Sequence, residues 1–179
     1  MSDSTTEHMQ GLSQKYLVLI KVLIISVPLG TALYWVFYNS LPEGFMLALP
    51  IQTITDLPAL TRALALLVSM LPMSIAIYTL ITLKVLFSLY AQGVIFSARN
   101  VTCFRRLGFA LIAWVIATTL FTPLISGVLS YGAAAGKGVI VAKFGIEEVI
   151  MLIISGVVIV VSWAMNEGCK LKDEQALTI

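Results

Sequence analysis

Residues 107–131 read LGFALIAWVIATTLFTPLISGVLSY and contain no charged side chain. A helix needs about 20 consecutive, mostly apolar residues to cross the hydrocarbon core of a bilayer, so this stretch predicts a membrane span. Three further apolar runs meet the same requirement. They are residues 17–38; residues 63–90, of which 63–83 is uncharged; and residues 146–165, whose acids Glu147 and Glu148 lie in the first turn. The sequence therefore predicts an all-α polytopic membrane protein, a bundle of four transmembrane helices.

The composition excludes other classes of protein. Of the 179 residues, 59% are hydrophobic and 11% are charged, whereas soluble domains carry about 25% charged residues. With a mean hydropathy of +1.00, the chain has too little polar surface for a soluble globular enzyme or a disordered protein. The length suits one membrane domain over residues 1–179. A net charge of +2 is too small for direct binding to nucleic acid.

The positions of the basic residues predict the orientation, because cytoplasmic loops carry an excess of Lys and Arg. Eight basic residues fall on the side of both termini and of the loop between the second and third spans, and three fall on the other side. The eight are Lys15, Lys21, Lys84, Arg99, Arg105, Arg106, Lys170 and Lys172, and the three are Arg62, Lys137 and Lys143. We therefore expect both termini in the cytoplasm, where Cys103 and Cys169 would be reduced thiols.

Segments next to the spans also carry local signals. Residues 1–14 are polar and without period, which predicts a mobile tail. In the loop 39–62, the apolar stretch Phe45–Leu49 is too short to span, and it would lie at the interface or cover the mouth of the bundle. Asp56 predicts an N-cap for the second helix, which we expect to begin near Leu57.

The loop before the third span predicts a tight connection between two helices. Gly93 is typical of the residue that ends a helix in a left-handed conformation. Ser97 is a good N-cap for the next helix. The third helix is therefore expected to start about ten residues before its membrane span.

Prolines and hydroxyls occur at similar depth in three spans. Pro28, Pro72 and Pro123 each free a backbone carbonyl, and hydroxyl residues that include Thr122 and Ser126 stand nearby. One interpretation is a polar cavity in the outer half of the bundle, and the other is ordinary packing of membrane helices. Glu147 has two interpretations as well: a ligand for a proton or cation inside the membrane, or an acid favoured by the helix dipole.

The cytoplasmic ends of the spans carry the candidate partner-binding residues. Arg99, Arg105 and Arg106 either form a binding surface or anchor the chain to anionic lipid head groups. Acids of the C-terminal tail, Glu167 and Glu174 among them, are expected to pair with Arg105 and Arg106. Phe96, Leu177 and Ile179 complete the expected surface as apolar anchors.

Two motifs carry a family resemblance. Leu86–Gly108 follows L-F-x-L-Y-x-x-G-x-I-F-S-x-x-N-V-x-x-x-R-x-L-G, and Met165–Ile179 follows M-x-E-G-x-x-L-x-x-E-x-x-L-T-I. Over the second to fourth spans, the chain resembles an uncharacterised bacterial family of four-span inner-membrane proteins. Genes of that family often lie beside a gene for a small helix-turn-helix regulator of the Xre type. The resemblance implies a bacterial inner-membrane location and a regulator as partner.

The functional expectation follows from this resemblance. We find no HExxH, GxSxG, P-loop or GxGxxG motif, so an enzyme, a cofactor and a metal site are not expected. The first hypothesis is a regulatory or sensor protein of the bilayer that holds a small DNA-binding regulator at its cytoplasmic face. The alternative is a small transporter or channel component for a small or lipophilic solute, acting as a homo-oligomer. A third reading is a lipid- or protein-assembly factor.

Overall fold

The computed structural model describes residues 2–41, 56–94, 97–132, 140–142 and 144–176. These residues form four long helices, α1 (Ser2–Val36), α2 (Ala59–Ala91), α3 (Ala98–Gly132) and α4 (Ile146–Ala176), and one 3-10 turn at Tyr38–Ser40. All four helices are long and apolar enough to cross a membrane. The predicted all-α four-helix bundle is confirmed, and the described residues contain no strand.

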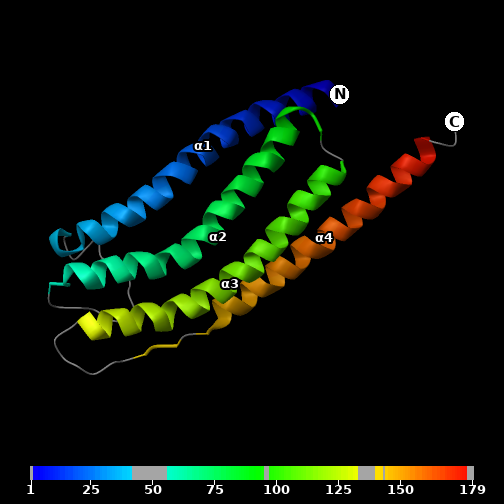
Figure 1. Ribbon diagram of the computed structural model, residues 1–179. Helices are drawn as coiled ribbons and strands as arrows, with labels where there is room; N and C mark the ends of the chain where they lie inside the picture. The colour runs from blue at the N-terminus through cyan, green and yellow to red at the C-terminus, as the bar shows by residue number, and fades with distance from the viewer. Residues whose placement is uncertain (1, 42–55, 95–96, 133–139, 143, 177–179) are drawn as a thin grey trace.

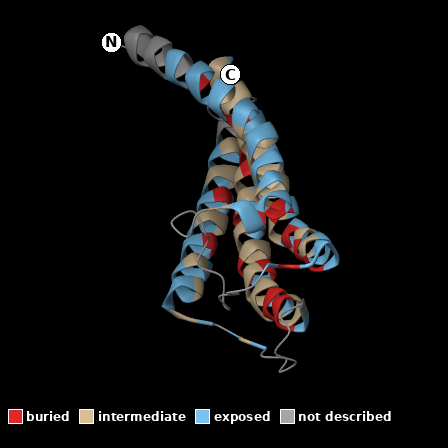
Figure 2. Cartoon of the chain, turned by 90° about the vertical axis from the view of Figure 1, so that its left-hand side faces the viewer, coloured by how far each residue is buried: buried red, intermediate tan, exposed pale blue. Residues whose placement is uncertain are grey.

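The helices lie side by side in chain order (Figure 1). α1 packs on α2, α2 on α3 and α3 on α4, and within the described residues any other pair of helices touches at most marginally. Figure 2 shows that exposed residues cover most of the outward surfaces, with buried residues in narrow patches between helices. Large apolar side chains such as Ile25, Leu67 and Val160 are more than half exposed. The bundle is therefore an open row whose faces suit lipid rather than water.

Two helices are longer than their apolar runs. α1 begins at Ser2, whereas residues 1–14 were predicted as a tail without regular structure, and α4 continues past Met165 to Ala176. Once a span has formed a stable helix, each further residue adds a hydrogen bond at low cost, so the helix propagates into polar sequence. An exposed pair, Lys170 Nζ to Glu167 Oε2 at 3.2 Å, lies on the extension of α4.

The prediction that Asp56 caps α2 is wrong. Pro58 occupies the N-cap position, and it makes no side-chain capping bond. The chain before α2 is held instead by Asn39, whose Nδ2 donates to the Leu57 carbonyl and whose Oδ1 accepts from the Leu57 amide, both at 3.1 Å. Leu57 is buried. A tertiary contact thus fixes this segment where a local cap was expected.

A buried cluster joins α1, α2 and α3 at the end of the bundle that holds the 3-10 turn. Trp35 Nε1 donates to Ser69 Oγ at 2.9 Å, and Ser69 donates to the Ala65 carbonyl at 2.8 Å. The Trp35 and Tyr38 rings stack with centroids 5.5 Å apart. Arg62 Nη1 donates to the Val36 carbonyl at 2.6 Å, so it satisfies an acceptor at the end of α1. The cluster consists of Trp35, Tyr38, Leu57, Ala65, Ile125 and Leu129.

The predicted end of α2 and start of α3 are confirmed. Gly93 has φ = 76°, its amide donates to the Tyr90 carbonyl, and the Val94 amide donates to the Leu89 carbonyl, both at 3.0 Å. This pair of bonds is the Schellman motif, which requires a left-handed residue at the glycine. Ser97 Oγ accepts from the Asn100 amide at 3.3 Å as an N-cap. Asn100 is fully buried and donates to the Val94 carbonyl at 2.9 Å, which locks the turn.

α3 and α4 approach most closely at Gly108. Ser155 Oγ donates to the Gly108 carbonyl at 2.7 Å. A Cβ added at Gly108 would lie 2.5 Å from Cγ1 of Ile159. Because the two helices are antiparallel, this contact places Ile146 beside Ala117, near the middle of α3. The other end of α4 runs about 11 residues, or about 16 Å, past the start of α3.

We expect Asn39→Leu to destabilise the fold. Both polar groups of the buried Leu57 backbone would lose their partner, which costs about 1–3 kcal/mol. The free energy of unfolding, measured by SDS titration in mixed micelles, reports the loss. Ser40→Ala, at the exposed neighbouring position, is the control and should change it by less than about 0.5 kcal/mol. Equal values for the two variants would show that the Asn39 bonds do not hold this segment.

Gly108→Ala should disturb the α3–α4 contact. The new methyl group collides with Ile159, and such overpacking costs about 1–3 kcal/mol. The same titration should show that Ile159→Ala partly reverses the loss in the double variant. Gly127→Ala is the matched control, because a Cβ at this α3 glycine meets nothing within 4 Å. The close contact is refuted if the two glycine variants are equally stable.

Candidate functional site

The two termini and the α2–α3 turn lie at the same end of the bundle (Figure 1). We call this end the terminal face; it comprises residues 2–15, 91–94, 97–98 and 163–176. The stacked rings of Tyr16 and Phe87, with centroids 5.1 Å apart, set the register of α1 on α2. From that contact α1 continues about ten residues, or about 15 Å, further than α2 does. The terminal face therefore carries two projecting helical arms, the first turns of α1 and the last turns of α4.

The basic residues proposed for partner binding lie on the first turns of α3. The side chains of Arg99, Arg105 and Arg106 are all exposed. No hydrogen bond or ion pair joins them to another of the described residues. Phe96, Leu177 and Ile179 lie outside the described residues, as does the side chain of Glu174.

The expected pairing of Glu167 with Arg105 and Arg106 is not seen. Glu167 instead pairs with Lys170 on its own helix, and both side chains are about two-thirds exposed. The register explains the difference. Glu167 is 12 residues beyond Ser155, whereas α3 extends only ten residues beyond Gly108 in that direction. Glu167 thus lies level with the start of α3, at least one helical turn from the level of Arg105.

The hydroxyls near the prolines are used within their own helices. Thr122 donates to the Thr118 carbonyl at 3.2 Å, Ser126 to the Pro123 carbonyl at 3.0 Å, and Thr31, near Pro28, to the Val27 carbonyl at 3.1 Å. Near Pro72, Ser69 holds Trp35. Back-bonding of this kind is frequent where proline interrupts a helix in lipid. This pattern favours the ordinary-packing interpretation over the polar cavity.

The acids at the start of α4 have different surroundings. Glu148 Oε2 accepts from the Gly145 amide at 2.7 Å, which is the reach-back bond of a capping box. Glu147 is exposed beside it. Glu148 therefore serves the helix start, as the dipole interpretation expects.

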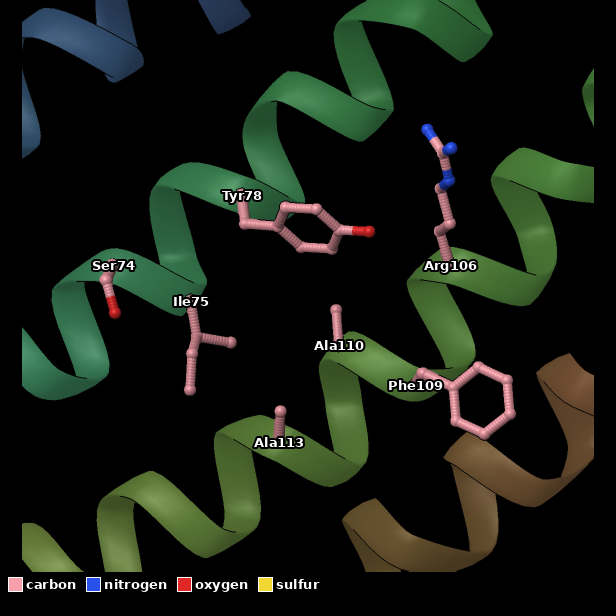
Figure 3. Close-up of a pocket in the computed structure, with 7 residues that line it drawn as sticks. All are labelled: Ser74, Ile75, Tyr78, Arg106, Phe109, Ala110 and Ala113. Atoms are coloured by element: carbon pink, nitrogen blue, oxygen red, sulfur yellow. The ribbon is translucent and has the colours of Figure 1, made fainter.

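A groove between α2 and α3 was not foreseen from the sequence. Its volume is about 430 Å³, and its walls include Ile75 and Tyr78 of α2 and Arg106, Ala110 and Ala113 of α3. Figure 3 shows that the Tyr78 hydroxyl points from α2 toward the side on which the Arg106 guanidinium lies. Phe109, which also borders the groove, turns its ring away from α2. In the sequence, Ala110 and Ala113 look like ordinary residues of an apolar span. Only the charge of Arg106, at the end of that span, could have indicated the site.

The described residues contain no group of three or more His, Cys, Asp or Glu side chains that could hold a metal ion. Cys103 is buried and Cys169 is partly exposed, and both are free thiols. Counted from the Ser155–Gly108 contact, Cys169 of α4 lies beyond the first residue of α3. Cys103 lies further along α3 than that first residue. The arrangement thus offers exposed cations on the first turns of α3 and a groove between α2 and α3.

Four apolar helices and exposed apolar faces define the chain as a multi-pass membrane protein. A family model described as "Protein of unknown function (DUF2975)" matches residues 5–179. The chain belongs to this uncharacterised family. No curated protein and no solved structure matches this chain.

Thiol labelling tests the predicted orientation. If the terminal face is cytoplasmic, a membrane-impermeant maleimide will label Cys169 only after the cells are permeabilised, and it will label a Ser40→Cys variant in intact cells. Cys169→Ala identifies the signal, and Cys103 should react slowly throughout because it is 4% exposed. Labelling of Cys169 in intact cells together with protection of Ser40→Cys would reverse the orientation.

Proposed function

We propose that the protein is a regulatory or sensor protein of a bacterial inner membrane that binds a small helix-turn-helix regulator at its terminal face. The observation that carries this proposal is the pair of helical arms: the first turns of α1 extend about 15 Å past the end of α2, and the last turns of α4 extend past the start of α3. Two helical arms that flank a turn suit a small helical domain as partner.

The chemistry of the terminal face supports a protein partner. Trp163 is 65% exposed and stands eight residues beyond Ser155, level with the start of α3. Arg99 and Arg105 are exposed on the first turns of α3. Trp and Arg are the residues most enriched at the centres of protein interfaces. The partner would offer carboxylates to the arginines and an apolar pocket to Trp163.

The alternative, a transporter or channel, has less support. The helices described by the structure form an open row, so a second copy would have to close a path along them. The hydroxyls of the expected path already bond within their own helices. A lumen would need polar groups that are free to meet the solute.

Photocrosslinking in cells tests the proposal. A photoreactive residue at Ala98, exposed on the terminal face, should capture a small DNA-binding protein, and one at Leu60, exposed at the opposite end, should not. The double variant Arg99→Ala/Arg105→Ala should lower the capture at least tenfold, because two charge-assisted contacts are lost. Lys84→Ala, which removes an exposed cation outside the terminal face, is the control. Capture of only lipid or of the protein itself from Ala98 would refute the proposal.

A further inference from the structure

The α2–α3 groove has a polar end at Arg106 and Tyr78. The rest of its lining is apolar except for Ser74, whose hydroxyl donates to the Leu71 carbonyl at 2.8 Å. Arg106 stands at the side nearer the terminal face, and from there the groove continues along α3 to Ala113, a distance of about 10 Å. Its volume of about 430 Å³ falls within the range of ligand sites. The groove is therefore amphipathic along the axis of the bundle.

Small side chains create this space. Ala110 and Ala113 lie three residues apart on α3, on the face that meets Ile75 and Tyr78 of α2 (Figure 3). Ala110 is 3% exposed, and its short side chain leaves the packed surface of α3 as the floor of the groove at this point. A larger residue at either alanine would fill the groove, so the depression depends on their size.

The polar end of the groove consists of Arg106 and Tyr78. The Arg106 guanidinium is exposed, and neither it nor the Tyr78 hydroxyl has a hydrogen-bond partner among the described residues. Figure 3 shows both groups on the same side of the groove. A guanidinium and a hydroxyl donor together suit a phosphate oxygen, which accepts charge-assisted hydrogen bonds.

The depth of the groove matches a lipid. Arg106 is the last cation before the uncharged run 107–131, so it marks where the apolar span begins. A phosphate bound there lies at the level of the head groups, and the stretch from Arg106 to Ala113 covers about a third of a hydrocarbon core roughly 30 Å thick. Basic pockets between membrane helices are typical sites for anionic head groups.

We propose that this groove binds one anionic phospholipid from the leaflet on the side of the terminal face. The lipid phosphate accepts from Arg106 and Tyr78, and one acyl chain lies over Ile75, Ala110 and Ala113. Arg105, the next residue on the helix, is turned by about 100° and does not line the groove. This site does not depend on the proposed regulator.

Native mass spectrometry of the purified full-length chain, released from micelles that contain phosphatidylglycerol or phosphatidylcholine, tests the site. Arg106→Gln should lower retained phosphatidylglycerol at least fivefold, and Tyr78→Phe should lower it by a smaller factor. Arg105→Gln, the matched cation, and Tyr131→Phe, an exposed tyrosine outside the groove, should change retention less than twofold. Equal losses for Arg106→Gln and Arg105→Gln would show that the lipid is held only by general surface charge and would overturn the proposal.

A second variant tests the acyl-chain part without touching the charge. Ala113→Leu fills the groove and should lower retention of both lipids, whereas Ala164→Leu, at an exposed alanine of α4, should not. Size-exclusion elution identifies any variant that fails to fold. Added inorganic phosphate separates the two sources of the ligand group: displacement of phosphatidylglycerol by millimolar phosphate would overturn the lipid assignment in favour of a free-phosphate site, and retention of the lipid supports it.

Discussion

The position of α4 depends on one close contact, the approach of Ser155 and Ile159 to Gly108 of α3. Inside a membrane, apolar burial gives little drive for one helix to choose a place on another, so small residues and hydrogen bonds decide the register. Here the contact joins a glycine ten residues from the start of α3 to a serine nine residues from the start of α4. The beginning of α4 therefore lies at mid-height on α3, and its end projects beyond it. An extended segment continues along the other half of α3, where the Val141 amide donates to Ser126 at 3.0 Å.

This register changes the character of the terminal face. The exposed apolar residues Val160 and Trp163 reach the level of the first turns of α3, which carry Arg99 and Arg105. Toward the terminal face, the uncharged parts of the apolar runs of α1, α2 and α3 end near Lys21, Lys84 and Arg106. The apolar run of α4 continues about eight residues further in the same direction. An exposed aromatic ring thus lies at about the same level along the bundle as these cations. Trp is favoured at such boundaries and also at the centres of interfaces, so Trp163 suits a surface that meets lipid on one side and a protein on the other.

Much of the fold could be predicted from local signals. Hydropathy locates all four spans because each is one continuous apolar run of the sequence. Gly93 and Ser97 determine the α2–α3 turn locally, through the left-handed backbone of Gly93 and the capping bond of Ser97. The errors concern contacts between distant residues. Asp56 was expected to cap α2, but Asn39 holds that segment from 18 residues away. Glu167 was expected at Arg105, but the pairing depends on a helix register that hydropathy does not encode. The groove was missed for the same reason, since Ala110 and Ala113 become a surface only when Tyr78 lies opposite them.

The groove and the terminal face share the first part of α3. Arg106 borders the groove, and Arg99 lies two helical turns away on the same rigid helix, with the Asn100 bond that locks the α2–α3 turn between them. A phosphate on Arg106 and Tyr78 would link α2 to α3 across the groove, and Asn100 ties the start of α3 to Val94 in the turn that follows α2. Two such links would hold the start of α3 in one position relative to α2. A ligand changes an equilibrium only through its different affinity for two states, and here the two states would differ in how firmly α3 is held at the face that meets the partner. Taken together, the proposed lipid site and the proposed partner site would give a physical route by which the composition of the membrane changes the docking of a protein outside it.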